Sequence, residues 1–338
     1  MKLALRTLAV AVAGLAAAAP APAAAQVPTP TPPASVPAPT ATPAPPAAVP
    51  GKLVARVKGG LKLGGEQVAL TGDEVRVKGR LKPAVGGGQR VQLRLNSGGR
   101  NLKTRKVTVK PNGRFAVPMR LKAVTGKVTI SAIHKASGKI KRAQARRVKL
   151  RAYAPSLSFG SDGPVAGLFN RELRKLKYAA PRSGTYDSAT GRAVMAYRKV
   201  NGLPRTESPS DAIVRDVLAG RGAYKVRHPS LGKHLETDLS QQTLALVDGD
   251  KLVRVYTTSS GAPATPTVRG TYRFYRKDLG TNSLGMVHAS YFIGGYAIHG
   301  YKSVPPYGAS HGCLRVPIPD ALKIFDWIEL EDRIRVEA

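Results

Sequence analysis

Apolar and polar residues alternate along several short stretches between residues 52 and 152, among them 75–81, 91–95 and 128–133. A period of two is typical of strands that bury one face. Two further stretches of this kind stand on either side of a Pro111-Asn112-Gly113 turn. The pattern predicts an all-β antiparallel sandwich over 52–152, immunoglobulin-like in a loose sense.

The pattern changes to a helical spacing after residue 155. From 164 to 177 the apolar residues lie three or four positions apart, at Val165, Leu168, Phe169, Leu173 and Leu176. Stretches 190–200 and 211–218 follow, the second after Ser208-Pro209-Ser210, which can cap a helix. A small three-helix bundle is predicted over 155–222.

Strand-like alternation returns in residues 223–338. An Asp248-Gly249-Asp250 turn joins two apolar stretches, as in a hairpin. Near the end, 320–327 has a helical pattern and a short strand follows it. This segment is predicted to be a mainly-β domain.

The first residues have the layout of a secretory signal peptide. Lys2 and Arg6 precede an apolar run over 8–19, and Ala23-Ala24-Ala25 forms a cleavage site before Gln26. The run is short for a membrane span of about 20 residues, although an uncleaved anchor is the alternative. We therefore predict a signal peptide over 1–25 and an exported, extracytoplasmic protein (cell wall or periplasm), with no transmembrane span after cleavage.

Residues 26–51 are almost entirely Pro, Ala, Thr and Val. Proline removes backbone donors and favours extended polyproline II structure. The segment is predicted to be a linker, either a spacer that holds the following domains away from a surface or a connection without such a role.

Positive charge is concentrated in the predicted sandwich. The chain has a formal net charge of +34, and residues 51–154 hold 27 lysines and arginines against three acids, which gives +24. Such a domain attracts polyanions. Outside a membrane these are anionic wall polymers or lipid headgroups, and no nucleic acid is expected as a partner. The alternative is that the charges only keep the surface solvated.

Cys313 is the only cysteine, so the chain can form no internal disulfide. It lies in Ser310-His311-Gly312-Cys313, shortly after His299, a setting that indicates a catalytic nucleophile. The residues alone leave both histidines open as the base that activates the thiol. Gly312 permits a backbone in which the Gly312 and Cys313 amides form an oxyanion hole. No cluster has metal-ligand spacing, so neither a metal nor a cofactor is predicted.

Residues 223–338 closely resemble the L,D-transpeptidase catalytic domain. The motifs that carry the resemblance are His299-Gly300, Ser310-His311-Gly312-Cys313-Leu314-Arg315 and Thr265-Pro266-Thr267-Val268-Arg269-Gly270-Thr271-Tyr272. The resemblance implies that His299 is the base, oriented by the carbonyl of Gly300, and that His311 supports the site by hydrogen bonding. Ser310, Tyr296 and Arg315 are further candidates at the substrate site. Arg315 is expected to bind a stem-peptide carboxylate or else to form a structural ion pair.

The reaction that the resemblance implies uses peptidoglycan stem peptides. Cys313 forms a thioester, and an amine of a neighbouring stem then takes the acyl group to give a 3→3 cross-link. Water as the acceptor makes the same enzyme an L,D-carboxypeptidase. A non-catalytic cell-wall-binding protein is the remaining alternative.

Residues 155–222 resemble a three-helix peptidoglycan-binding domain, which implies that peptidoglycan glycan is a further partner. The matching features are Gly160-Ser161-Asp162-Gly163, Gly184-Thr185-Tyr186, Ala193-Val194-Met195-Ala196-Tyr197 and Asn201-Gly202-Leu203. Phe169-Asn170 and Arg198 depart from the family pattern, because glutamines are usual there. A helical spacer without affinity for glycan is the alternative.

Overall fold

A computed structural model describes residues 46–338. The predicted signal peptide and most of the predicted linker lie outside the described residues. Within 46–338, no helix has both the length and the apolar character needed to cross a membrane.

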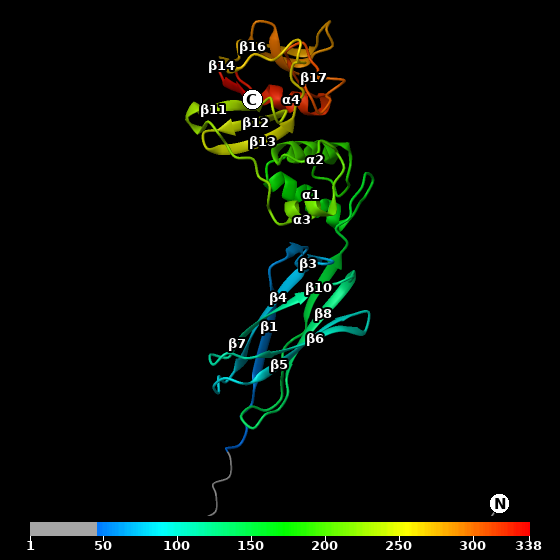
Figure 1. The fold of residues 1–338 in the computed structure, drawn as a ribbon, viewed down its shortest axis with the longest axis vertical. Coiled ribbons are helices and arrows are strands. Elements are labelled where there is room, and N and C mark those ends of the chain that lie inside the picture. The colour runs from blue at the N-terminus through cyan, green and yellow to red at the C-terminus, as the bar shows by residue number, and fades with distance from the viewer. Residues whose placement is uncertain (1–45) are drawn as a thin grey trace, which may run out of the picture. The chain divides into compact units, whose positions relative to one another are not determined.

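The β-rich region that the alternation predicts is present (Figure 1). It contains ten strands. They are β1 (Lys52–Lys58), β2 (Leu61–Leu63), β3 (Glu66–Leu70), β4 (Glu74–Lys82), β5 (Arg90–Ser97), β6 (Arg100–Thr108), β7 (Arg114–Arg120), β8 (Gly126–His134), β9 (Ala143–Gln144) and β10 (Val148–Tyr153). One sheet has the order β1-β4-β7, and the other has the order β2-β3-β10-β8-β5-β6 with β9 paired to β8. The immunoglobulin-like description stays a prediction.

The two sheets share one apolar core, to which the inward residues of each strand contribute. In β4, for example, Val75, Val77 and Leu81 are buried while Arg76 and Arg80 are exposed. The pairing differs from the antiparallel expectation in one place, because β10 lies parallel to β3. Alternation reports which face of a strand is buried, but not the direction of the neighbouring strand.

Three helices follow this region: α1 (Pro164–Lys175), α2 (Ser188–Val200) and α3 (Asp211–Leu218). The Asp187 side chain accepts the Thr190 amide at the start of α2, and Ser210 does the same for Ile213 in α3. The helices share an apolar cluster with Val247 of the next sheet. The three predicted helices are present. Their description as a bundle stays a prediction.

The C-terminal part is mainly β, as predicted. A short 3-10 turn, η1 (Pro229–Leu231), precedes its strands, which are β11 (Lys233–Asp238), β12 (Thr243–Asp248), β13 (Lys251–Thr257), β14 (Gly270–Arg273), β15 (Arg276–Thr281), β16 (Val287–Ile293), β17 (Tyr296–Tyr301), β18 (Leu314–Pro317) and β19 (Arg333–Glu337). They form one sheet of order β13-β12-β11-β19-β14 and another of order β15-β16-β17-β18. Helix α4 (Ile318–Trp327) contacts β16, β17 and β18.

Candidate active site

The two histidine-containing motifs meet through a parallel strand pair. β17 and β18 are paired so that His299 lies opposite Arg315. Partners in a parallel pair place their side chains on the same face, and residues two apart on one strand share a face. Cys313 comes directly before β18 and two residues before Arg315, and the charge of Arg315 acts on both the Cys313 thiol and the His299 ring.

The Cys313 thiol is half-buried, and its Sγ lies 3.7 Å from the carbonyl oxygen of Gly295. Burial raises the pKa of Cys313, while a backbone hydrogen bond from Ala297 and the charge of Arg315 oppose the shift. The resting nucleophile is therefore a neutral thiol, which needs a base before it can attack.

His299 is 4% exposed, and its Nδ1 lies 3.0 Å from the carbonyl oxygen of Gly300. A carbonyl only accepts, so Nδ1 carries the proton and donates it, which leaves Nε2 with a free lone pair. Burial lowers the pKa of His299, helped by the charge of Arg315 and opposed by the Gly300 contact. The imidazole is thus neutral at neutral pH. This is the contact with Gly300 that the resemblance implies.

Gly312 forms a bend that only glycine fits. Its φ is +113°, and a Cβ built on it would lie 1.7 Å from Cε1 of Tyr296. The half-buried Tyr296 ring therefore packs directly on the backbone before the nucleophile. Because of this bend, His311 and Cys313 do not lie on an extended strand.

Ser310 holds the bend together and is itself buried. Its hydroxyl accepts the Gly312 N–H at 3.0 Å and donates to the Cys313 carbonyl oxygen at 2.6 Å. The Gly312 amide, predicted as one of two oxyanion donors, is therefore already engaged. The Cys313 amide has no acceptor among the described residues and stays available.

The other two candidates have different surroundings. His311 is exposed, and no side-chain hydrogen bond to it occurs within 46–338. Arg315 is half-buried, lies 4.2 Å from the centre of the Tyr301 ring and donates to the Ala309 carbonyl oxygen at 3.1 Å. Among the described ion pairs none includes Arg315, so the structural ion pair is not observed.

Sequence reasoning assigned no role to the hydroxyl side chains that hold the catalytic loop from outside. Thr265 Oγ1 donates to the Ser310 carbonyl oxygen at 2.9 Å, Thr267 Oγ1 to that of Gly312 at 2.8 Å, and Thr258 Oγ1 to that of Arg315 at 2.8 Å. The Thr265–Thr267 stretch stood out as a motif, but the sequence does not say which carbonyls its hydroxyls reach.

Lys199 of α2 is a further supporting residue to which sequence reasoning assigned no role. It is 2% exposed, and its Nζ donates to the Gln242 carbonyl oxygen at 3.0 Å, the Thr257 hydroxyl at 2.6 Å and the Thr258 carbonyl oxygen at 2.8 Å. Burial, together with the charge of Arg205, lowers the pKa of Lys199 to about 7. A helix outside the catalytic strands thus contributes a buried amine to their support.

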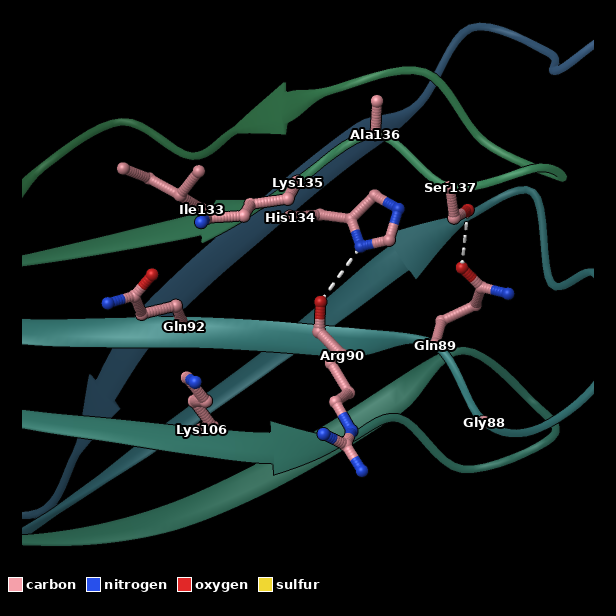
Figure 2. Close-up of a pocket in the computed structure, with 10 residues that line it drawn as sticks. All are labelled: Gly88, Gln89, Arg90, Gln92, Lys106, Ile133, His134, Lys135, Ala136 and Ser137. Atoms are coloured by element: carbon pink, nitrogen blue, oxygen red, sulfur yellow. Dashed lines mark hydrogen bonds between the residues drawn. The ribbon is translucent and has the colours of Figure 1, made fainter.

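A pocket of about 360 Å³ lies in the β-rich region and not at Cys313. Figure 2 shows His134 within it, with Nδ1 2.8 Å from the Arg90 carbonyl oxygen, and the Ser137 hydroxyl donating to Gln89 at 2.8 Å. His134 Nε2 has no partner and is itself inaccessible, so it presents no group to the pocket. Within 46–338, no group of three His, Cys, Asp or Glu residues is arranged to hold a metal ion.

Comparison with known proteins gives a family match and similar solved structures. The model of the L,D-transpeptidase catalytic domain (YkuD) matches residues 232–336. An L,D-transpeptidase from Xylanimonas cellulosilytica is 32% identical, with a TM-score of 0.50, over 53% of this chain and 96% of that one. An L,D-transpeptidase from Stackebrandtia nassauensis is 17% identical, with a TM-score of 0.33, over 54% of this chain and 95% of that one. Among curated proteins there is no match.

The family match covers the cysteine and both histidines of the site. This chain covers 96% of the Xylanimonas structure, at a sequence identity of 32%. The chain belongs to the L,D-transpeptidase family, and residues 232–336 are its catalytic domain.

Proposed function

We propose that this protein is an exported cysteine L,D-transpeptidase that forms 3→3 cross-links between peptidoglycan stem peptides. The observation that carries the proposal is that the paired strands β17 and β18 bring the Cys313 loop beside the buried His299, whose Nδ1 donates to the Gly300 carbonyl and leaves Nε2 free. The proposed signal peptide (1–25) and linker (26–51) suit an enzyme that works outside the membrane. We propose 52–152, 155–222 and 223–338 as its three domains.

In the first step His299 Nε2 takes the proton of Cys313. The thiolate attacks the carbonyl of a diaminopimelate-like residue at position 3 of a tetrapeptide stem. Negative charge develops on that oxygen, and the free Cys313 N–H is placed to donate to it, an interaction of about 3–4 kcal/mol. The His299 imidazolium then protonates the amine of the departing D-alanine, and the stem remains joined to Cys313 as a thioester.

In the second step His299 accepts a proton from the side-chain amine of a neighbouring stem. That amine attacks the thioester and the Cys313 thiolate leaves. The His299 imidazolium then returns the proton to the thiolate. Arg315 keeps an uncompensated positive charge beside the site and is proposed to bind a stem carboxylate. Water in place of the amine gives the carboxypeptidase reaction from the same intermediate.

Intact mass spectrometry after incubation with a carbapenem tests the nucleophile. We expect one adduct on the wild type and none on Cys313→Ala. His299→Gln should slow acylation by at least about 100-fold, whereas His311→Gln, which changes an exposed histidine, is the matched control and should acylate nearly normally. A folded wild type without an adduct would instead support a non-catalytic wall-binding protein.

A disaccharide-tetrapeptide substrate separates the two acceptors. A cross-linked dimer with release of D-alanine supports the transpeptidase, and accumulation of tripeptide alone identifies a carboxypeptidase.

A further inference from the structure

The outward face of the β1-β4-β7 sheet is almost uniformly cationic. The three strands alternate between buried and outward residues along their length. The outward positions hold nine lysines and arginines, which we call the cationic face: Lys52, Arg56, Lys58, Arg76, Lys78, Arg80, Lys82, Arg114 and Arg120.

The strand register places like charges directly opposite one another. The opposed pairs are Lys52–Lys82, Arg56–Lys78, Lys58–Arg76 and Arg80–Arg114. Like charges in such positions destabilise a sheet. These strands place one carboxylate on the same side, that of Glu74, which lies opposite Arg120 at one end. The ion pairs found in 46–338 include none of the nine cations.

The crowding is also visible at a single group. The charge of Lys58 is the main cause that lowers the pKa of Lys78, followed by burial and the charge of Arg76. A solubilising surface does not require cations in register, because charges spread over the molecule serve the same purpose at lower cost. An anion lying over the face would relieve the repulsion.

The face is also hollowed. A depression of about 560 Å³ is lined by Arg56, Lys78, Arg80 and Arg114, with Val54 and Ala116 between them. Alternate residues on a strand are about 6.6 Å apart and neighbouring strands about 4.8 Å apart. The cations therefore form rows that continue beyond the depression at both ends, which suits an extended chain of charges better than one small anion.

We propose that the cationic face binds a linear polyol phosphate, a polymer of phosphodiester groups without bases. Lysine and arginine are the usual partners of phosphate groups. Proteins that bind single-stranded nucleic acid add aromatic side chains on which bases stack. Phe115, the aromatic residue of these strands, also lines the depression, but it is 4% exposed and packs in the core, so it offers no accessible ring for stacking. This binding is separate from the proposed transpeptidase reaction.

The test measures binding of poly(glycerol phosphate) to the purified protein by calorimetry, at salt concentrations of about 50 to 200 mM. One variant carries Arg56→Gln, Lys78→Gln and Arg80→Gln. The matched control carries Arg94→Gln, Lys127→Gln and Arg147→Gln, which remove equal charge from a depression on the other sheet.

We expect the first variant to lose affinity at least about tenfold and to lower the salt slope by about 2, for three lost contacts at about 0.7 each. The control should change affinity less than about threefold. Because the first variant removes both members of the Arg56–Lys78 pair and one member of the Arg80–Arg114 pair, its melting temperature should not fall. A carbapenem adduct at Cys313 in both variants separates this outcome from the fate of the proposed reaction.

Equal losses in the two variants would show that only net charge matters, and would overturn the proposal. So would unchanged affinity in a folded first variant. Single-stranded DNA is the competitor, and tighter binding of DNA than of poly(glycerol phosphate) would overturn the choice of polymer.

Discussion

Lys199→Met tests whether the helical region positions the catalytic loop. Methionine keeps an unbranched chain of similar length and removes only the amine. The three N–H groups of the Lys199 ammonium meet three acceptors, at Gln242, Thr257 and Thr258. After the substitution the Thr258 carbonyl oxygen loses its donor, whereas that of Gln242 still accepts the Thr258 amide.

Two opposing contributions determine the effect on stability. Lowering the pKa of Lys199 from 10.5 to about 7 corresponds to a cost of about 5 kcal/mol. The three charge-assisted hydrogen bonds return about 1.5–3 kcal/mol each. The two contributions nearly cancel, so we expect Lys199→Met to lower the free energy of unfolding by only about 2 kcal/mol.

The effect on activity should be larger, because the support continues to the nucleophile. Nζ holds the Thr258 carbonyl, and the Thr258 hydroxyl donates to the Arg315 carbonyl oxygen. Ser259 and Arg315 exchange two backbone hydrogen bonds of 2.9 Å. Arg315 is two residues from Cys313, and a displacement of about 1 Å at a reacting group costs up to about 100-fold. We expect acylation to slow by about 10- to 100-fold.

Time-resolved mass spectrometry of the carbapenem adduct measures this rate, and thermal denaturation measures stability. Lys175→Met is the matched control, because the Lys175 side chain is 62% exposed on α1 and its ion-pair partner Glu172 keeps a second ion pair with Arg171; both quantities should stay near the wild-type values. If Lys199→Met lowers the melting temperature but leaves the acylation rate within about twofold, the amine stabilises the fold without positioning Cys313.

Three further outcomes follow from the structure. Since burial lowers the pKa of His299 and raises that of Cys313, the acylation rate should rise with pH through the His299 pKa and be level by neutrality; His299→Gln should abolish the rise. Although burial opposes it, hydrogen bonds from His234 and the His228 amide lower the pKa of Glu236 to about 2, below its ordinary 4.5. Glu236 should therefore contribute about 3 kcal/mol to the free energy of unfolding above pH 4.5, and this contribution should disappear as the pH falls to about 2. Denaturation at a series of pH values measures the loss, which should be much smaller in Glu236→Gln. Gly312→Ala should abolish acylation, whereas Gly295→Ala, where a Cβ meets nothing within 4 Å, should retain it in the same mass assay.

Local patterns predicted the elements well where one face is buried. In β4 the alternation is visible because Val75, Val77 and Leu81 point into the core and the residues between them do not. The same argument accounts for α1, where Leu168, Phe169 and Leu173 are buried. What such patterns omit is the partner of each element, so the parallel pairs β3–β10 and β17–β18 were not foreseen.

Lys199 shows the same limit at the level of one side chain. A lysine near the end of a helix is normally a solvated residue, and nothing in the sequence around it indicates otherwise. Its burial depends on carbonyls at Gln242 and Thr258, more than 40 residues further along the chain. Only the packing of α2 against β12 and β13 brings these groups together.

The catalytic motif itself illustrates what spacing alone leaves undecided. The Gly312 and Cys313 amides were predicted to form the oxyanion hole together, because Gly312 permits many backbone conformations. In the structure the Ser310 hydroxyl bridges the bend, accepting from the Gly312 amide and donating to the Cys313 carbonyl. The serine three residues before the nucleophile thus shapes the turn and engages one amide, which leaves the Cys313 amide as the donor that faces no acceptor of its own. We therefore expect Ser310→Ala to change the backbone geometry of the bend, because it removes both hydrogen bonds of the Ser310 hydroxyl, and not to act mainly through a lost contact with substrate.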